Sequence, residues 1–453
     1  MNRAKRVKGR FRDPLRGHSP MAEGPFLLGQ RAQFGNGARV VVARTPGLHS
    51  AMLALYVRAG SRHERPATSG VSHFVEHLLF RGSQGYPDSR VMNGAVEAAG
   101  GSMNAMTGRD HTCYYTSLHP AGLETGIDVF TDLARRPLLR DIEVERGVVL
   151  EEILDEVDSR GRDIDADNLL KRIVFPDHGL GQKIAGSRAS VETLGEVAIR
   201  AHHARHYTGA NVVLVAAGPV FYEEVVELAA ERLGALPRGT AIRSEAPPPW
   251  PSGPTFGAVE HDDAQVEFSL AFPSVPERHR DHPAALVIRR ILDDGLSSRL
   301  PFEIVERQGL AYSIHASLET YEDAALFTFE GACTPSRLGR VVEEIFRVVS
   351  GLWDSLLPGS ELARVHERHR MSLTFALDNP SELAGWFGIG ELFGAEETLE
   401  ERCRRVERVT AADVRRVART MFQRRHLVAV AVGPGASTLR RSLQRAAERS
   451  PLA

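Results

Sequence analysis

Two histidines and a glutamate lie close together in the stretch SHFVEHLLFRG, residues 72–82. On an α-helix each residue advances by about 100°, so His73 and His77 lie roughly 40° apart on one face. Their imidazoles can reach a common ion, and imidazole nitrogen is a good ligand for zinc. Glu76 lies roughly 60° to the other side of His73, where its carboxylate can reach a ligand of that ion. The spacing indicates a metal site with a catalytic base, and the alternative is a helix with two partly exposed histidines.

A catalytic zinc site needs a third protein ligand and an open position. The acid-rich stretch DIEVERGVVLEEILDEVDSR, residues 141–160, could supply that ligand from a second helix. Glu145 and Glu152 are seven residues apart and therefore share a helix face. Spacing alone does not choose between Glu151 and Glu152, and an acidic helix can also be explained by solvation.

A second histidine-rich stretch, AHHARHY at residues 201–207, offers His202, His203 and His206. No suitably spaced acid accompanies them, so we expect a structural helix here and not a second metal site.

Composition excludes several classes of protein. The chain has 453 residues, enough for two or three domains, and its net charge of -2 gives no sign of a nucleic-acid partner. No run approaches the roughly 20 apolar residues of a membrane helix. Three cysteines, Cys113, Cys333 and Cys403, lie far apart and form no CxxC pair, which argues against a disulfide framework.

The N-terminal stretch MNRAKRVKGRFRDPLRGHSP is basic, with Asp13 as its one acid. We expect residues 1–22 to form a flexible tail, and the alternative is an organellar transit peptide, since such peptides are Arg-rich and acid-poor. The stretch lacks the apolar run of a secretory signal. We therefore expect a bacterial-type cytoplasmic protein, or a mitochondrial matrix protein if the tail is a transit peptide.

The chain divides into two similar halves. Residues 236–254, LPRGTAIRSEAPPPWPSGP, contain six prolines and no apolar period, as expected of a linker. The first half closes with NVVLVAAGPV at 211–220 and the second with HLVAVAVGPG at 426–435. This shared ending predicts an internal duplication. We expect an N-terminal domain at 23–235, a linker at 236–255 and a C-terminal domain at 256–453.

Each half mixes strand and helix periods. ARVVVART and SAMLALYVRAG predict a hairpin that turns at PGLH, and MNAMTGRDHTCYYTSLH predicts two further strands. SHFVEHLLFRG, LETGIDVFTDLARR and IEVERGVVLEEILDEV predict helices. Hairpins interspersed with helices favour an α+β fold with mainly antiparallel sheet in each domain.

The sequence also resembles a known family, the pitrilysin-type zinc metallopeptidases or inverzincins, whose signature is H-x-x-E-H. The resemblance covers roughly residues 30 to 435. It is carried by blocks in family order: GVSHFVEHLLFRGSQGYP, EAAGGSMNAMTGRDHTCYYTSL, VERGVVLEEILDE, HARHYTGANVVLVAAGPV and GLSSRLPFEIVERQGLAYSI. The two-domain length is similar to the smaller members, such as the mitochondrial processing peptidase subunits and their bacterial relatives, which usually pair to enclose a chamber.

The resemblance implies roles for single residues. His73 and His77 match the histidine ligands and Glu76 the general base. The block ERGVVLEE matches the family's ER-x-V-V-x-x-E, which makes Glu152 the third ligand and Glu145 a supporting acid. Asn104 and Ala105 match the NA of the substrate-binding edge strand; alternatively Gly100, Gly101 and Asn104 only shape a turn.

The second half departs from the family pattern. PAALVIRRILDDGLSSRL stands in place of the metal helix and has no histidine pair, so we expect one Zn²⁺ per chain. Members carry an Arg and a Tyr seven residues apart that contact the substrate and the developing oxyanion. Tyr312 matches the tyrosine, but the arginine position holds Val305, and we expect Arg307 to point elsewhere. The departure fits a chain that needs a partner subunit for an Arg/Tyr half-site, and it also fits a homodimer in which this contact with the substrate is weakened.

Together these features predict a zinc endopeptidase that cleaves extended or unfolded peptides inside a chamber of paired subunits, as a homodimer or as a heterodimer with a related chain. The competing hypothesis is a non-catalytic or partner-dependent subunit with the same fold. A peptidase devoted to one processing event is a third possibility, which the sequence does not separate from the first.

Overall fold

The computed structural model describes residues 28–395 and 397–452. The basic tail predicted at residues 1–22, with its alternative as a transit peptide, lies outside the described residues. None of the helices in the described part of the chain combines the length and the apolar character that crossing a membrane requires.

The first half forms a six-stranded sheet in the order β1-β2-β6-β3-β5-β4. Its strands are β1 (Leu28–Gln33), β2 (Arg39–Arg44), β3 (Ala51–Val57), β4 (Ser102–Thr107), β5 (Thr112–Leu118) and β6 (Val212–Gly218). The predicted hairpin of β2 with β3 is wrong, because β6 lies between them, parallel to β2 and antiparallel to β3. These strands are buried on both faces, and their unbroken apolar runs carry no information about which strand is the neighbour.

The second half forms a five-stranded sheet in the order β7-β11-β8-β10-β9. Its strands are β7 (Thr255–Glu260), β8 (Val266–Pro273), β9 (Ser313–Thr320), β10 (Ala325–Cys333) and β11 (Val428–Gly433). This order reproduces β2-β6-β3-β5-β4, including the one parallel pair, β7 with β11. The shared topology confirms the predicted duplication and the mainly antiparallel α+β class.

Helices from the same half cover one face of each sheet. On the first sheet these are α1 (Val71–Leu79), α2 (Ser89–Ala98), α3 (Leu123–Arg135), α4 (Ile142–Leu154), α6 (Arg188–Thr193), α7 (Glu196–His206) and α8 (Tyr222–Leu233). On the second sheet they are α9 (His282–Leu292), α10 (Leu338–Asp354), α11 (Gly359–Ala376), α13 (Leu399–Glu407), α14 (Ala411–Met421) and α15 (Ala436–Glu448). Each face buries an apolar core, which is the main favourable term in folding.

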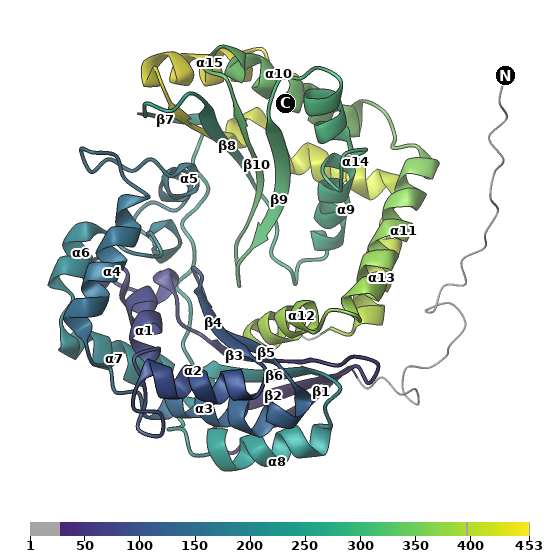
Figure 1. Cartoon of the computed structure of the whole chain (residues 1–453). Coiled ribbons are helices and arrows are strands. Elements are labelled where there is room, and N and C mark those ends of the chain that lie inside the picture. Colours follow the sequence, from purple (N-terminus) through teal and green to yellow (C-terminus); the bar gives the residue numbers. More distant parts are fainter. Residues whose placement is uncertain (1–27, 396, 453) are drawn as a thin grey trace.

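The remaining face of each sheet is covered by a helix from the other half. Helix α5 (Ala166–Val174) packs Leu169 and Leu170 against Val428 and Val430 of the second sheet. Helix α12 (Pro380–Phe393) packs Phe387 and its neighbours against the first sheet. Figure 1 shows α12 beside the first sheet and α5 beside the second. The exchange ties the halves together through two apolar cores.

Polar contacts also join the halves, at the tips of two hairpins. The backbone N–H of Glu322, in the β9–β10 turn, donates to Asp110 Oδ2 in the β4–β5 turn at 3.2 Å. Arg62 donates to Asp323 in the same turn at 2.5 Å. The buried Lys171 of α5 pairs with Asp167 at 2.6 Å and with Glu319 of β9. The β4–β5 turn therefore lies next to the β9–β10 turn.

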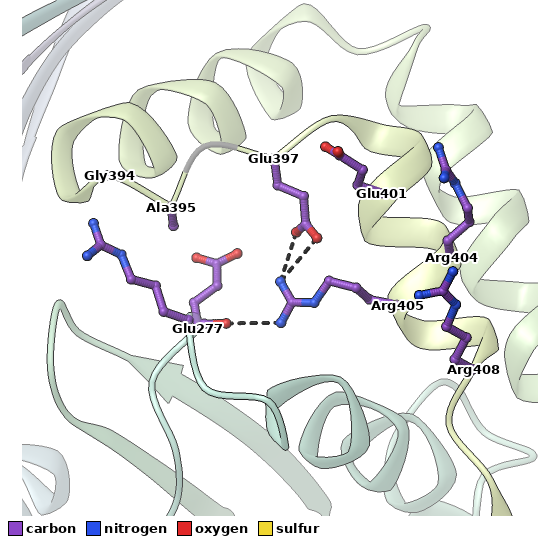
Figure 2. A pocket seen from close by; sticks show the side chains of 9 residues that line it. Glu277, Gly394, Ala395, Glu397, Glu401, Arg404, Arg405 and Arg408 are labelled. Carbon is purple, nitrogen blue, oxygen red and sulfur yellow. Dashed lines mark hydrogen bonds and ion pairs between the residues drawn. The ribbon is translucent and has the colours of Figure 1, made fainter. Parts of the chain in front are cut away.

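Ion pairs hold the connection between α12 and α13 to the second half. Arg405 of α13 bonds to Glu397 and to the backbone carbonyl of Glu277 (Figure 2). They line a pocket of about 440 Å³ together with Arg278, Gly394, Ala395, Glu401, Arg404 and Arg408. Arg402 pairs with Glu277 as well. These contacts fix where the chain returns from α12, on the first sheet, to α13 of the second half.

The packing of α12 against β3 can be tested by substitution of two glycines in the helix. An added Cβ at Gly388 would overlap the Tyr56 ring of β3, whereas one at Gly385 would lie 3.9 Å from Tyr56 Oη, an ordinary contact. Gly388→Ala should therefore destabilise the protein by about 1–3 kcal/mol through overpacking. Gly385→Ala, in the same helix, should stabilise it by up to about 1 kcal/mol, because alanine is the better helix former. Urea unfolding midpoints compare the two, and equal midpoints would contradict this packing.

Candidate metal and catalytic site

Helix α1 carries the first three site residues, on the face that its apolar residues leave free. Phe74, Val75 and Leu78 are buried in the first core. His73, Glu76 and His77 lie on the opposite side and are half-buried. The helical period therefore places the core residues and the site residues of this nine-residue helix on opposite faces.

Glu152 of α4 meets the two histidines across the α1–α4 packing. Its Oε2 lies 3.6 Å from His73 Nε2 and 3.6 Å from His77 Nε2. One ligand atom from each of the three residues lies within 4.8 Å of the others, and within residues 28–395 and 397–452 no other group of His, Cys, Asp and Glu is this compact. Glu151, the other acid that the spacing allowed, is not in the group. Two imidazole nitrogens and a carboxylate oxygen are a donor set that fits zinc.

Glu145 lies behind His77. Its Oε2 is 3.0 Å from His77 Nδ1, and its Oε1 accepts a hydrogen bond from Arg81. A carboxylate on Nδ1 fixes the ring so that Nε2 is free to bind a metal. His73 differs, because its buried Nδ1 has no hydrogen-bond partner in the described chain.

The protonation states suit metal binding and base catalysis. Burial, with a smaller contribution from His77, lowers the pKa of His73 to about 4, so the ring is neutral at pH 7. Burial raises the pKa of Glu76 above its ordinary value, and a hydrogen bond donated by Thr107 partly opposes that rise. A carboxylate with a raised pKa is a better proton acceptor near neutral pH.

Strand β4 borders this site as the free edge of the first sheet. It pairs with β5 on one side and is the last strand in the sheet order. Asn104 is exposed and Ala105 half-buried, as the pleat requires. Gly100, with φ of 75°, shapes the turn before the strand, whereas Asn104 lies within it.

The tyrosine and the arginine position lie in the second half. Tyr312 directly precedes β9 and is 82% exposed. Val305 packs against the second core from a short π-helix, Pro301–Glu306. Arg307 pairs with Glu303 at 3.0 Å instead of standing in for the missing arginine. The described structure shows no contact between these residues and the metal group of the same chain.

Three residues near the site were missed by the sequence analysis. Arg81 follows His77 by four residues, so helical spacing could have placed it on the face of the histidines. Thr107 follows Ala105 by two residues, so the strand period could have placed both on the side of α1. Glu64 is the third: its two oxygens accept from the backbone N–H groups of Gly70 and Ser72, and no spacing rule points to it.

The histidines of α7 are used in packing. His202 Nε2 lies 3.2 Å from Ser72 Oγ of α1, and the ring stacks on His206 at 4.3 Å. His206 Nδ1 lies 2.6 Å from the backbone carbonyl of Arg58. Burial lowers the pKa values of His203 and His206 to about 4, so both are neutral at pH 7.

Comparison with known proteins places this geometry in context. Residues 39–188 match the family model described as insulinase (peptidase family M16), and residues 197–367 match that of the peptidase M16 inactive domain. An uncharacterised zinc protease of Mycobacterium tuberculosis is 34% identical over 429 residues, which are 92% of this chain and 96% of the relative.

Two further proteins are similar over most of their length. The beta subunit of a mitochondrial-processing peptidase from Blastocladiella emersonii is 29% identical over 416 residues, 88% of this chain and 87% of the subunit. The crystal structure of a protease from Helicobacter pylori superposes with a TM-score of 0.82 at 21% identity, covering 90% of this chain and 100% of that one. At this identity, the similarity to the Helicobacter pylori structure shows a shared fold.

Proposed function

Because this chain belongs to the insulinase family of peptidases, peptidase family M16, we propose that it is a zinc-dependent endopeptidase that cleaves extended or unfolded peptides. The observation that carries the proposal is the meeting of Glu152 with His73 and His77, beside Glu76 and the open edge of β4. Metal binding, proton transfer and substrate binding can then each be assigned to particular residues.

His73, His77 and Glu152 would hold one zinc ion per chain, and Glu145 would keep the His77 ring in the orientation that exposes Nε2. When bound, zinc lowers the pKa of water towards about 7 and polarises a carbonyl group.

Glu76 would act as general base and then as general acid. Its carboxylate accepts a proton from the water that attacks the scissile carbonyl and delivers that proton to the leaving nitrogen. Thr107 holds the carboxylate at the end of β4 through its hydroxyl. Burial, which raises the pKa of Glu76, favours the first of these transfers.

The free edge of β4 would bind the substrate. An extended peptide can add to an exposed edge through main-chain hydrogen bonds, which gives affinity with little dependence on sequence. Asn104 and Ala105 lie in the middle of that edge. Most main-chain groups of a folded domain are already paired, so unfolded or extended segments are the expected substrates.

Tyr312 would act on the site of a partner subunit. Its own β9 ends at the hairpin tip that contacts Asp110, three residues beyond Thr107. The eight residues of β9 separate Tyr312 from that tip, a span of about 26 Å. Tyr312 therefore lies at the end of β9 that is farther from the metal group of its own chain. Paired chains that enclose a chamber would bring one chain's Tyr312 to the other's metal site.

A non-catalytic or partner-dependent subunit is the second candidate. Val305 favours it, because it replaces the arginine that the family resemblance expects and Arg307 is held by Glu303. In that case a related subunit would supply the complete Arg/Tyr half-site.

Replacing the base separates catalysis from metal binding. Glu76→Gln should keep one zinc per chain and lose about 10²- to 10⁴-fold in turnover, because the amide cannot accept the proton. The matched control is Glu151→Gln, which changes an acid outside the metal group and should leave turnover near that of the unaltered chain. A quenched fluorescent peptide and metal analysis of the same samples provide the measurement. Retained hydrolysis in Glu76→Gln would remove Glu76 from the mechanism.

Mixing two inactive variants tests whether Tyr312 acts across subunits. Glu76→Gln and Tyr312→Phe should each be strongly impaired, but a refolded equal mixture should recover about a quarter of the unaltered activity, because each mixed dimer has one intact centre. Mixing Glu76→Gln with His73→Ala is the control, since both lesions fall on the metal side and no centre is restored. If the unaltered chain is an active dimer and the first mixture recovers no activity, Tyr312 does not act on the partner's site.

A further inference from the structure

The first turn of α1 is held from outside the helix. Glu64 accepts hydrogen bonds from the backbone N–H groups of Gly70 and Ser72, each at 2.7 Å. The Ser72 hydroxyl lies 3.2 Å from His202 Nε2 of α7. Glu64, Ser72 and His202 are all buried, and we refer to them as the α1 clamp.

A side chain at the N-cap position of α1 cannot satisfy these N–H groups. Gly70 occupies the N-cap position with a φ of 91°, in the left-handed region, and provides no side-chain cap. A Cβ there would meet the backbone carbonyl oxygen of Ala185 at 2.5 Å. The serine, threonine or aspartate that usually caps a helix is therefore excluded, and a carboxylate from another segment satisfies the N–H groups instead.

The clamp lies next to His73, the metal-binding residue in the first turn of α1. His73 is the third residue of α1 and lies in its first turn, whereas His77 lies in its last turn. Helix ends open with little free energy unless they are tied down. His77 is in addition oriented by Glu145, but the buried Nδ1 of His73 has no partner in the described chain. The place of the His73 ring therefore depends on the backbone that carries it.

We propose that Glu64, supported by the Ser72–His202 pair, is a positioning residue that fixes His73 for metal binding. This inference rests on the proposed zinc function. The clamp touches neither metal nor substrate. It acts by holding the first turn of α1, so that the nitrogen of His73 stays in register with those of His77 and Glu152.

The burial of an acidic side chain in this place supports the role. Burial raises the pKa of Glu64 to about 7, while the two N–H donors work in the opposite direction. A buried carboxylate is unfavourable unless its hydrogen bonds are made. Here both oxygens are used on the helix that carries the ligands, and a negative charge at a helix N-terminus is favoured by the helix dipole.

The test is the zinc affinity of the full chain, measured by competition with a chromophoric chelator. Glu64→Gln keeps the size of the side chain but places an NH₂ group against a backbone N–H. It should weaken zinc binding by about 10- to 100-fold, the range found for residues that orient metal ligands. Ser72→Ala should weaken binding in the same direction and by less. If the glutamine variant fails to fold, the serine variant decides.

The control removes a helix cap that serves no metal residue. Asp88 caps α2 in the same half by accepting from the backbone N–H of Val91 at 2.8 Å. Asp88→Ala should lower the urea unfolding midpoint and leave zinc affinity unchanged. Unchanged affinity in Glu64→Gln and Ser72→Ala, with normal binding by the unaltered chain, would overturn the clamp alone. Absence of zinc binding by the unaltered chain would overturn the proposed function and the clamp with it.

Discussion

The packing of α4 against α1 is the contact on which the candidate site depends. It brings Glu152 within 3.6 Å of both histidines and Glu145 within 3.0 Å of His77. Two helices that are separate in the sequence thus provide a donor set that neither could form alone. The core beneath them, with Phe74 and Val149 fully buried, keeps the spacing between the helices constant.

In the second half, the two helices that correspond to α1 and α4 lack the H-x-x-E-H motif and are joined by a different contact. By their order after the matching strands, α9 and α11 correspond to α1 and α4. There, Asp294, two residues beyond the end of α9, bonds to Arg290 of α9 at 3.0 Å and to Arg368 of α11 at 2.9 Å. An arginine–carboxylate cluster thus joins the two helices where the first half has its metal-binding group.

Local spacing predicted much of the site, and long-range contacts decided the rest. The interval between His73 and His77 depends on the helix period alone, so their common face could be foreseen. The preference for Glu152 over Glu151 came from a family resemblance, because both acids fit the spacing. The hairpin of β2 with β3 was predicted wrongly, since β6 joins the sheet from a distant part of the chain.

The exchange of α5 and α12 has no local signal, because an apolar helix face does not identify the sheet it will cover. Glu64 is hidden for a similar reason: its partners are backbone groups, which every residue carries.

The most direct test of this account is a zinc titration of the metal-free chain, with cleavage of a quenched fluorescent peptide followed in the same samples. If His73, His77 and Glu152 form the catalytic metal site, cleavage should rise in proportion to added zinc, reach its plateau at one zinc per chain, and disappear again with chelator. Cleavage that is independent of zinc, or one bound zinc per chain with no cleavage by the paired chain, would contradict it.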